Sequence, residues 1–159
     1  MMKVSMAAPK TQTSRLGDLL DILEEHQQID EALLRHQETL LGLEFTHALG
    51  ALEELERRLS RHIRREEESL FGVYAGLGGF PQGAHPDVFR EEHRRIERSL
   101  KDLLAGARGL TLGAGVRRAV ILLLERETRF KTLLSGHAQR EEQHLYARLK
   151  ELWSAEKRP

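Results

Sequence analysis

The feature that most constrains this sequence is a histidine followed four residues later by a carboxylate, which occurs four times. On an α-helix, residues four apart share one face and lie about one turn from each other. Two of these pairs, His62 with Glu66 and His137 with Glu141, also share a Glu at +5, a Leu at +8 and an aromatic residue at +9. We interpret the two segments as copies of one repeat.

The other two pairs, His26 with Asp30 and His93 with Glu97, form a second kind of repeat. Each lies in a Glu-Glu-His segment, with an Ile three residues and a Leu seven residues after the histidine. The two kinds alternate along the chain, and matching histidines are 67 and 75 residues apart. This order predicts a duplicated helical hairpin.

Apolar residues recur at three- and four-residue spacing in four segments, which we expect to be amphipathic helices. The expected helices span about residues 14–41, 45–73, 87–107 and 116–153. Residues 76–86, rich in Gly and Pro, predict a loop, and Asp87 is a possible cap for the helix that follows. We therefore expect an all-α fold, an antiparallel up-down-up-down four-helix bundle, in residues 14–154. Residues 1–13 lack periodicity and are expected to form a disordered tail.

Composition excludes several classes of function. The 25 Lys and Arg residues balance the 25 Asp and Glu residues, so no net basic field attracts nucleic acid. The chain has no cysteine, which excludes disulfides, thiolate nucleophiles and iron–sulfur ligation within it. No apolar run has the length of a signal peptide or a membrane span. We expect a cytoplasmic protein without a nucleic-acid or membrane partner, in which nitrogen and oxygen atoms hold any metal.

The four histidine–carboxylate pairs are expected to meet in one layer of the core. Burying an unpaired charge costs several kcal/mol, and neighbouring carboxylates also repel each other. A bound cation removes both penalties. Imidazole and carboxylate ligands suit iron, manganese or zinc rather than copper(I), and two ions bridged by carboxylates fit the twofold repeat. Ferritin-like diiron bundles place Glu before His, the reverse of the order found here.

Together these segments resemble a hemerythrin-like domain of the HHE cation-binding kind, over about residues 16–153. The resemblance is carried by HQQID, HIRREEESLF, EEHRRIE and HAQREEQHLY. It implies a non-haem diiron site in a four-helix bundle, in which zinc, manganese or nickel can replace iron. Each iron would have two His ligands, and both would share two Glu ligands. The implied ligands are His26 and His62 for one ion, His93 and His137 for the other, and Glu66 and Glu141 as bridges.

One position departs from the oxygen-carrying hemerythrins. They place a second histidine one turn further along the third helix, where this chain has Glu97. The loss of that nitrogen argues against reversible oxygen storage, and the chain resembles the four-His, two-Glu variants associated with iron handling, redox or nitric-oxide responses. Asp30 and Glu97 are each open to two interpretations, an additional ligand or a partner that orients a histidine.

Three functions remain open from the sequence. The favoured one is a diiron protein, without enzymatic turnover, that binds, senses or reacts with oxygen, peroxide or nitric oxide, or handles iron. The second is a diiron oxidase or peroxidase, with His144, Tyr74 and Tyr146 as candidate proton donors. The third is a metal-free helical interaction module. The oligomeric state is open. His36 and Glu127 are assigned no role.

Overall fold

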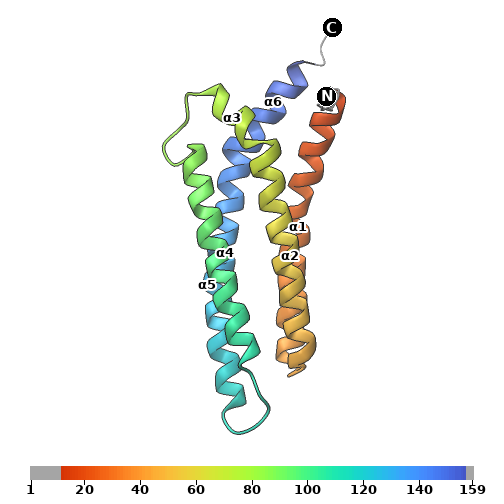
Figure 1. Cartoon of the computed structure of the whole chain (residues 1–159), viewed down its shortest axis with the longest axis vertical. Helices are drawn as coiled ribbons and strands as arrows, with labels where there is room; N and C mark the ends of the chain where they lie inside the picture. The colour runs from red at the N-terminus through yellow and green to blue at the C-terminus, as the bar shows by residue number, and fades with distance from the viewer. Residues whose placement is uncertain (1–11, 157–159) are drawn as a thin grey trace, which may run out of the picture.

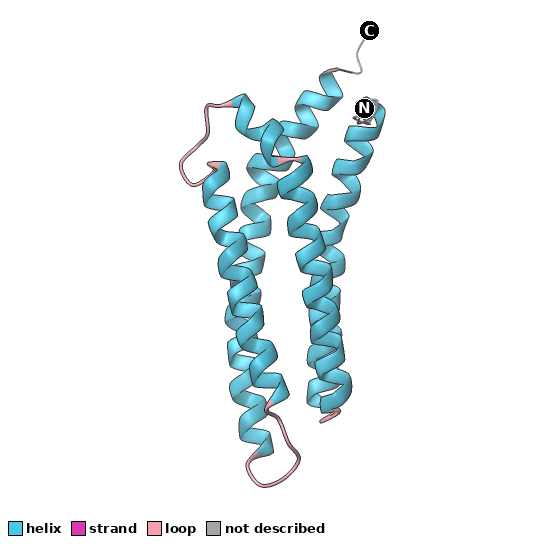
Figure 2. Cartoon of the chain, in the orientation of Figure 1, coloured by secondary structure: helices cyan, strands magenta, loops and turns pink. Residues whose placement is uncertain are grey.

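The computed structural model describes residues 12–156, and all regular structure in that range is helical (Figure 2). The helices are α1 (Gln12–Leu41), α2 (Phe45–Ser69), α3 (Phe71–Leu77), α4 (Pro86–Arg108), α5 (Val116–Arg140), the π-helix η1 (Glu141–Tyr146) and α6 (Ala147–Ala155). The expected all-α class is confirmed. Residues 1–11 of the expected tail lie outside the described range. No described helix is both long enough and apolar enough to cross a lipid bilayer.

The four long helices lie lengthwise beside one another (Figure 1). Helix α1 packs on α2, α2 on α4, α4 on α5, and α5 on α1. The buried residues Ala48, Leu52, Leu55 and Leu59 of α2 recur every three or four residues, which matches the helical period and places them on one face. Short α3 and the C-terminal α6 lie at the end of the bundle where α1 begins (Figure 1).

The second helix is shorter than its apolar pattern predicted. It ends one residue before Leu70, whose φ of −112° departs from the helical range. The break redirects the chain into α3, and Phe71 and Tyr74 of α3 are fully buried. Residues 78–85 then form the connection that Gly and Pro predicted.

The start of α4 differs from the expected cap. His85, not Asp87, is the capping residue, and its Nδ1 accepts a hydrogen bond from the Asp87 backbone N–H at 3.2 Å. Pro86 occupies the first helical position, where its missing N–H is not needed. Asp87 lies in the first turn, where a negative charge suits the helix dipole.

A polar layer separates the core into two apolar clusters. The larger cluster includes Leu52 and Phe130, and the smaller one includes Phe71 and Phe89. Each long helix contributes one histidine between them. These histidines are His26, His62, His93 and His137, of which the last three are buried and the first is 11% exposed.

A second buried polar contact lies beside the larger cluster, away from that layer. His36 of α1 and Glu127 of α5 are fully buried, and His36 Nε2 lies 2.6 Å from Glu127 Oε1. His36 Nδ1 donates to the Ala48 carbonyl at 2.7 Å, and Gln37 donates to Glu127 Oε2 at 3.2 Å. Because every polar atom of the pair has a partner, the pair ties α1 to α2 and α5.

Breaking this buried pair will destabilise the fold. Glu127→Leu leaves His36 Nε2 buried without a partner, and such a loss costs about 3–5 kcal/mol of unfolding free energy. Denaturant unfolding of wild type, Glu127→Leu, His36→Leu and the double variant gives the coupling between them, which we expect at about 1–3 kcal/mol. The exposed pair of His47 and Glu44, 3.0 Å apart, is the control and should show little coupling. A coupling as small for the buried pair would contradict its structural role.

Candidate metal centre

Six side chains meet at the centre of the polar layer. They form two groups of four, and both groups contain the same two carboxylates. The groups are His26, His62, Glu66 and Glu141, and His93, His137, Glu66 and Glu141. In each group one nitrogen or oxygen from every residue lies within 4.8 Å of the others. These are the six residues that the family resemblance implied, whereas the expectation that all four histidine–carboxylate pairs meet is wrong for the carboxylates Asp30 and Glu97, which belong to neither group. We call the two histidine pairs the α1–α2 position and the α4–α5 position.

Each shared carboxylate turns one oxygen toward each position. Glu66 Oε1 lies 3.0 Å from His62 Nε2, whereas its Oε2 lies 3.2 Å from His93 Nε2. In Glu141 the roles of the two oxygens are exchanged. Oε1 faces the α4–α5 position, 3.2 Å from His93 Nε2, and Oε2 faces the α1–α2 position, 3.6 Å from His26 Nε2. Atoms bound about 2.1 Å from one metal ion lie roughly 3.0–3.4 Å from each other. The spacing therefore fits one ion in each position.

Each histidine turns its other nitrogen to a carboxylate on a neighbouring helix, at 2.8 or 2.9 Å. The pairs are His62 with Glu25, His93 with Glu67, His137 with Glu92, and His26 with Glu142. A carboxylate of α1 thus contacts the histidine of α2, and one of α2 contacts the histidine of α4. In the same way a carboxylate of α4 contacts the histidine of α5, and one of η1 contacts the histidine of α1. The four contacts form a closed ring around the bundle, which we call the carboxylate ring.

The carboxylate ring fixes which imidazole nitrogen faces the centre. When Nδ1–H donates to a carboxylate, Nε2 of the neutral imidazole is a lone pair. In the neutral state four such lone pairs would face carboxylate oxygens, and either a proton on each Nε2 or a cation between the groups converts this repulsion into attraction. Two of the facing oxygens, Glu66 Oε2 and Glu141 Oε2, are buried and accept no hydrogen bond within the described chain. Because metal-ligating histidines generally donate their second N–H in this way, the residues present fit a metal pair.

Protons compete with a metal ion for the same nitrogens. Burial lowers the pKa of His26, but its contacts with Glu141 and Glu66 outweigh burial and raise the pKa from 6.5 to about 11. Similar contacts raise the pKa of His93 to about 10 and that of His62 to about 8. Burial raises the pKa of Glu66 and Glu141, but the imidazoles lower both below their usual range. Without metal, protons on the imidazoles therefore balance the carboxylates, and metal binding releases them.

Two arginines support the carboxylate ring. Arg65 forms an ion pair with Glu25, and Arg140 forms one with Glu92. Burial raises the pKa of both carboxyl groups, but the adjacent imidazole and guanidinium outweigh burial and lower it. Both carboxylates therefore stay ionised and keep accepting from the imidazole N–H groups. Each arginine follows a clustered histidine by three residues, so this support is duplicated as well.

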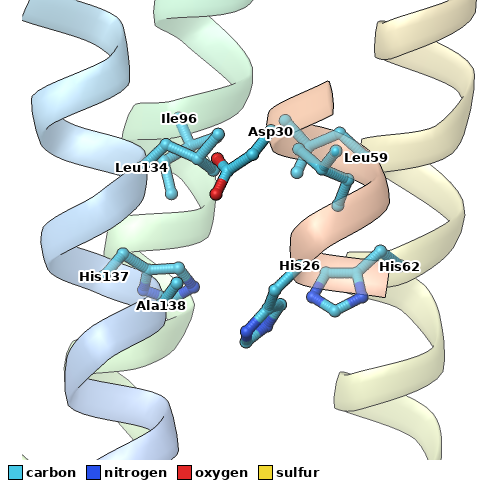
Figure 3. A pocket seen from close by; sticks show the side chains of 9 residues that line it. His26, Asp30, Leu59, His62, Ile96, Leu134, His137 and Ala138 are labelled. Carbon is cyan, nitrogen blue, oxygen red and sulfur yellow. The ribbon is translucent and has the colours of Figure 1, made fainter. Parts of the chain in front are cut away.

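Asp30 and Glu97 stand apart from both groups of four. Asp30 is exposed and lies in a layer with Leu59, Ile96 and Leu134, next to the histidines (Figure 3). Glu97 is half-buried and lines an outer cavity between α2 and α4. The carboxylate ring, rather than these two residues, orients the histidines.

The cavity beside the cluster is small and mostly apolar. It is lined by His26, His62 and His137 and by the layer that contains Leu59 and Leu134 (Figure 3). The centres of water-sized molecules can occupy about 20 Å³ of it, slightly more than one such molecule requires. The cavity has room for a diatomic molecule or water, and not for a large organic substrate.

The segment that carries Glu141 is not α-helical. It is the π-helix η1, whose i→i+5 hydrogen bonds place residues five apart on one face. Tyr146 therefore lies buried beside Glu141, and its hydroxyl donates to Glu66 Oε1 at 2.6 Å. Burial and the charges of Glu66 and Glu141 raise the pKa of Tyr146, so the hydroxyl keeps its proton. At the matching position of the first repeat, Phe71 stacks on His93 with ring centroids 5.4 Å apart.

Sequence reasoning missed two members of the carboxylate ring, Glu25 and Glu92. A signal was available, because each directly precedes a clustered histidine in a Glu-Glu-His repeat. Of the other candidate proton donors, Tyr74 donates to the Ala84 carbonyl at 2.7 Å, and His144 is half-buried and belongs to neither group.

These features define a helical bundle with a buried histidine–carboxylate cluster suited to two cations. The family model of the hemerythrin HHE cation-binding domain matches residues 18–149. This range covers most of the chain and contains all six clustered residues, so the chain belongs to the hemerythrin HHE cation-binding domain family. No curated protein and no solved structure matches the chain.

Proposed function

We propose that the chain binds two iron ions in this cluster and uses them to bind, sense or react with a small molecule such as oxygen, peroxide or nitric oxide, or to handle iron. The proposed ligands are His26 and His62, His93 and His137, and the bridging Glu66 and Glu141. The observation that carries the proposal is the sharing of two buried carboxylates by two histidine pairs. Zinc, manganese or nickel can occupy the same donors. The proposal includes an antiparallel up-down-up-down bundle in which each duplicated hairpin supplies one histidine pair.

An iron pair supplies redox chemistry and open coordination positions when bound. The side chains of the protein position the metal ions, orient the ligands and hold a proton near them. Glu66 and Glu141 hold the two positions together, and the carboxylate ring keeps each Nε2 directed inward. Apolar clusters flank the polar layer on both sides. Tyr146 holds a proton at its hydroxyl next to Glu66. Glu97 replaces a histidine of the oxygen-carrying hemerythrins, so among the described residues the α4–α5 position has the two imidazoles of His93 and His137, which favours reaction or sensing over reversible oxygen storage.

A diiron oxidase or peroxidase is the second candidate. The buried Tyr146 hydroxyl beside the cluster favours it, because proton delivery is a requirement of such chemistry. The small cavity beside His26, His62 and His137 suits a molecule of the size of peroxide or oxygen. Sustained turnover of peroxide by the iron-loaded protein would favour this candidate, and a single stoichiometric reaction would favour sensing or binding.

The test of the proposed function is metal content per chain, with an absorption spectrum, after aerobic expression in iron-supplemented medium. We expect about two irons per chain, with near-ultraviolet absorption of bound ferric iron. Both should be lost in the double variant His62→Ala, Glu66→Ala. Absence of bound metal, together with a double variant at least as stable as wild type, would instead identify a metal-free helical module.

A further inference from the structure

The two halves of the centre differ at one repeated position. Nine residues after the clustered histidine, the first repeat has Phe71 and the second has Tyr146. Tyr146 is 3% exposed and Glu66 is fully buried, and the hydroxyl donates to Glu66 Oε1 at 2.6 Å. Phe71 has no hydroxyl to offer Glu141. Tyr146 therefore makes one bridging carboxylate different from the other.

The oxygen that Tyr146 contacts belongs to the α1–α2 position. Glu66 Oε1 lies 3.0 Å from His62 Nε2 and 3.6 Å from His26 Nε2. The other carboxylate oxygen that faces this position, Glu141 Oε2, lies 3.6 Å from His26 Nε2 and accepts no hydrogen bond within the described residues. Of the two carboxylate oxygens that face the α1–α2 position, Glu66 Oε1 is therefore fixed by a hydrogen bond from Tyr146 and Glu141 Oε2 is not.

The nitrogen–oxygen distances at the α4–α5 position are shorter than those of His26 at the α1–α2 position, although Phe71 supplies no hydroxyl there. His93 Nε2 lies 3.2 Å from an oxygen of each carboxylate, and His137 Nε2 lies 3.0 Å from Glu141 Oε1. Its histidines are also more buried than His26, whose side chain is 11% exposed. The terminal torsion of a Glu side chain is soft, so a carboxylate that bridges to the looser position needs an external contact to keep its orientation.

We propose that Tyr146 is a positioning residue that holds Glu66 as the bridge to the α1–α2 position, so that metal binding there depends on Tyr146 and binding at the α4–α5 position does not. This inference rests on the proposed dinuclear centre. A carboxylate oxygen has two lone pairs, so Glu66 Oε1 can accept the hydroxyl and still bind an ion.

The experiment is a stepwise titration of the chelated full-length protein with cobalt(II) without oxygen, followed by calorimetry and visible absorption. His26→Ala and His137→Ala identify which binding step belongs to which position. Tyr146→Phe removes only the hydroxyl. The control is Tyr74→Phe, which removes the hydroxyl of the other tyrosine, also buried and hydrogen-bonded.

We expect Tyr146→Phe to weaken the step lost in His26→Ala by about 10- to 100-fold and to leave the step lost in His137→Ala unchanged. Tyr74→Phe should lower thermal stability and change neither step. Two unchanged steps, or two steps weakened equally by Tyr146→Phe, would overturn the inference while the dinuclear centre stands. Failure of the wild-type protein itself to bind cobalt would overturn the proposed function together with the inference.

Discussion

Glu66→Ala will weaken metal binding at both positions, whereas His26→Ala will weaken it at one. The reason is that Glu66 turns one oxygen to each histidine pair, while His26 belongs to a single group. After expression with iron and removal of loosely bound metal, we expect about two irons per chain in wild type, about one in His26→Ala and fewer than about 0.5 in Glu66→Ala. Elemental analysis per chain measures this.

The control is Glu68→Ala, two residues further along the same run of glutamates. Glu68 is exposed and belongs to neither group of four, so its variant should retain the wild-type iron content. Equal losses in Glu66→Ala and His26→Ala would argue against a bridging role for Glu66. A loss as large in Glu68→Ala would point to the net charge of the helix rather than to ligation.

Removal of the metal will lower the melting temperature by about 15–30 °C. Each ion bound at about 1,000 times its dissociation constant contributes about 4 kcal/mol, so two contribute about 8 kcal/mol. For a domain of this length, each kcal/mol corresponds to about 2–4 °C. Melting followed by circular dichroism, before and after chelation, measures the shift. We expect the chelated protein to remain helical, because both apolar clusters persist and protons replace the cations on the imidazoles.

Glu66→Ala serves as the control for chelation. It should melt at the same temperature with and without chelator, because it retains little metal to remove. If the melting temperature of the wild-type protein is the same before and after chelation, a tightly bound metal pair is contradicted.

The helices and the four clustered histidines could be predicted from the sequence because they depend on local spacing, and the choice of Glu66 and Glu141 among the four paired carboxylates followed from the family resemblance. Apolar residues at three- and four-residue intervals specify a buried face, and His62 with Glu66 and His137 with Glu141 lie on it. The same spacing does not bury Asp30, which follows His26 by four residues and is exposed. Duplication strengthened the prediction, because His62 with Glu66 and His137 with Glu141 share their neighbours as well.

The missed features depend on contacts between distant segments. Glu25 lies on the flank of α1, and its partner His62 is 37 residues away. His36 lies on the buried face of its helix, between Leu33 and Leu40, but its polar partners Glu127 and the Ala48 carbonyl are on other helices. The π-helix follows from backbone hydrogen bonding that no single residue between Glu141 and Tyr146 encodes. Spacing rules assume α geometry, whereas Glu141 lies in a π-helix and α2 ends at Ser69, three residues after Glu66.

The carboxylate ring has a consequence for the origin of the centre. Two of its contacts, Glu25 with His62 and Glu92 with His137, lie within a hairpin, and the other two cross between hairpins. Two identical hairpins related by a twofold axis would therefore build the same closed ring. In such an ancestor every ligand and every supporting carboxylate would be present twice from a single short gene. Fusion of two such copies into one chain would let them diverge, and the difference between Phe71 and Tyr146 is one that a symmetric dimer of identical chains could not carry.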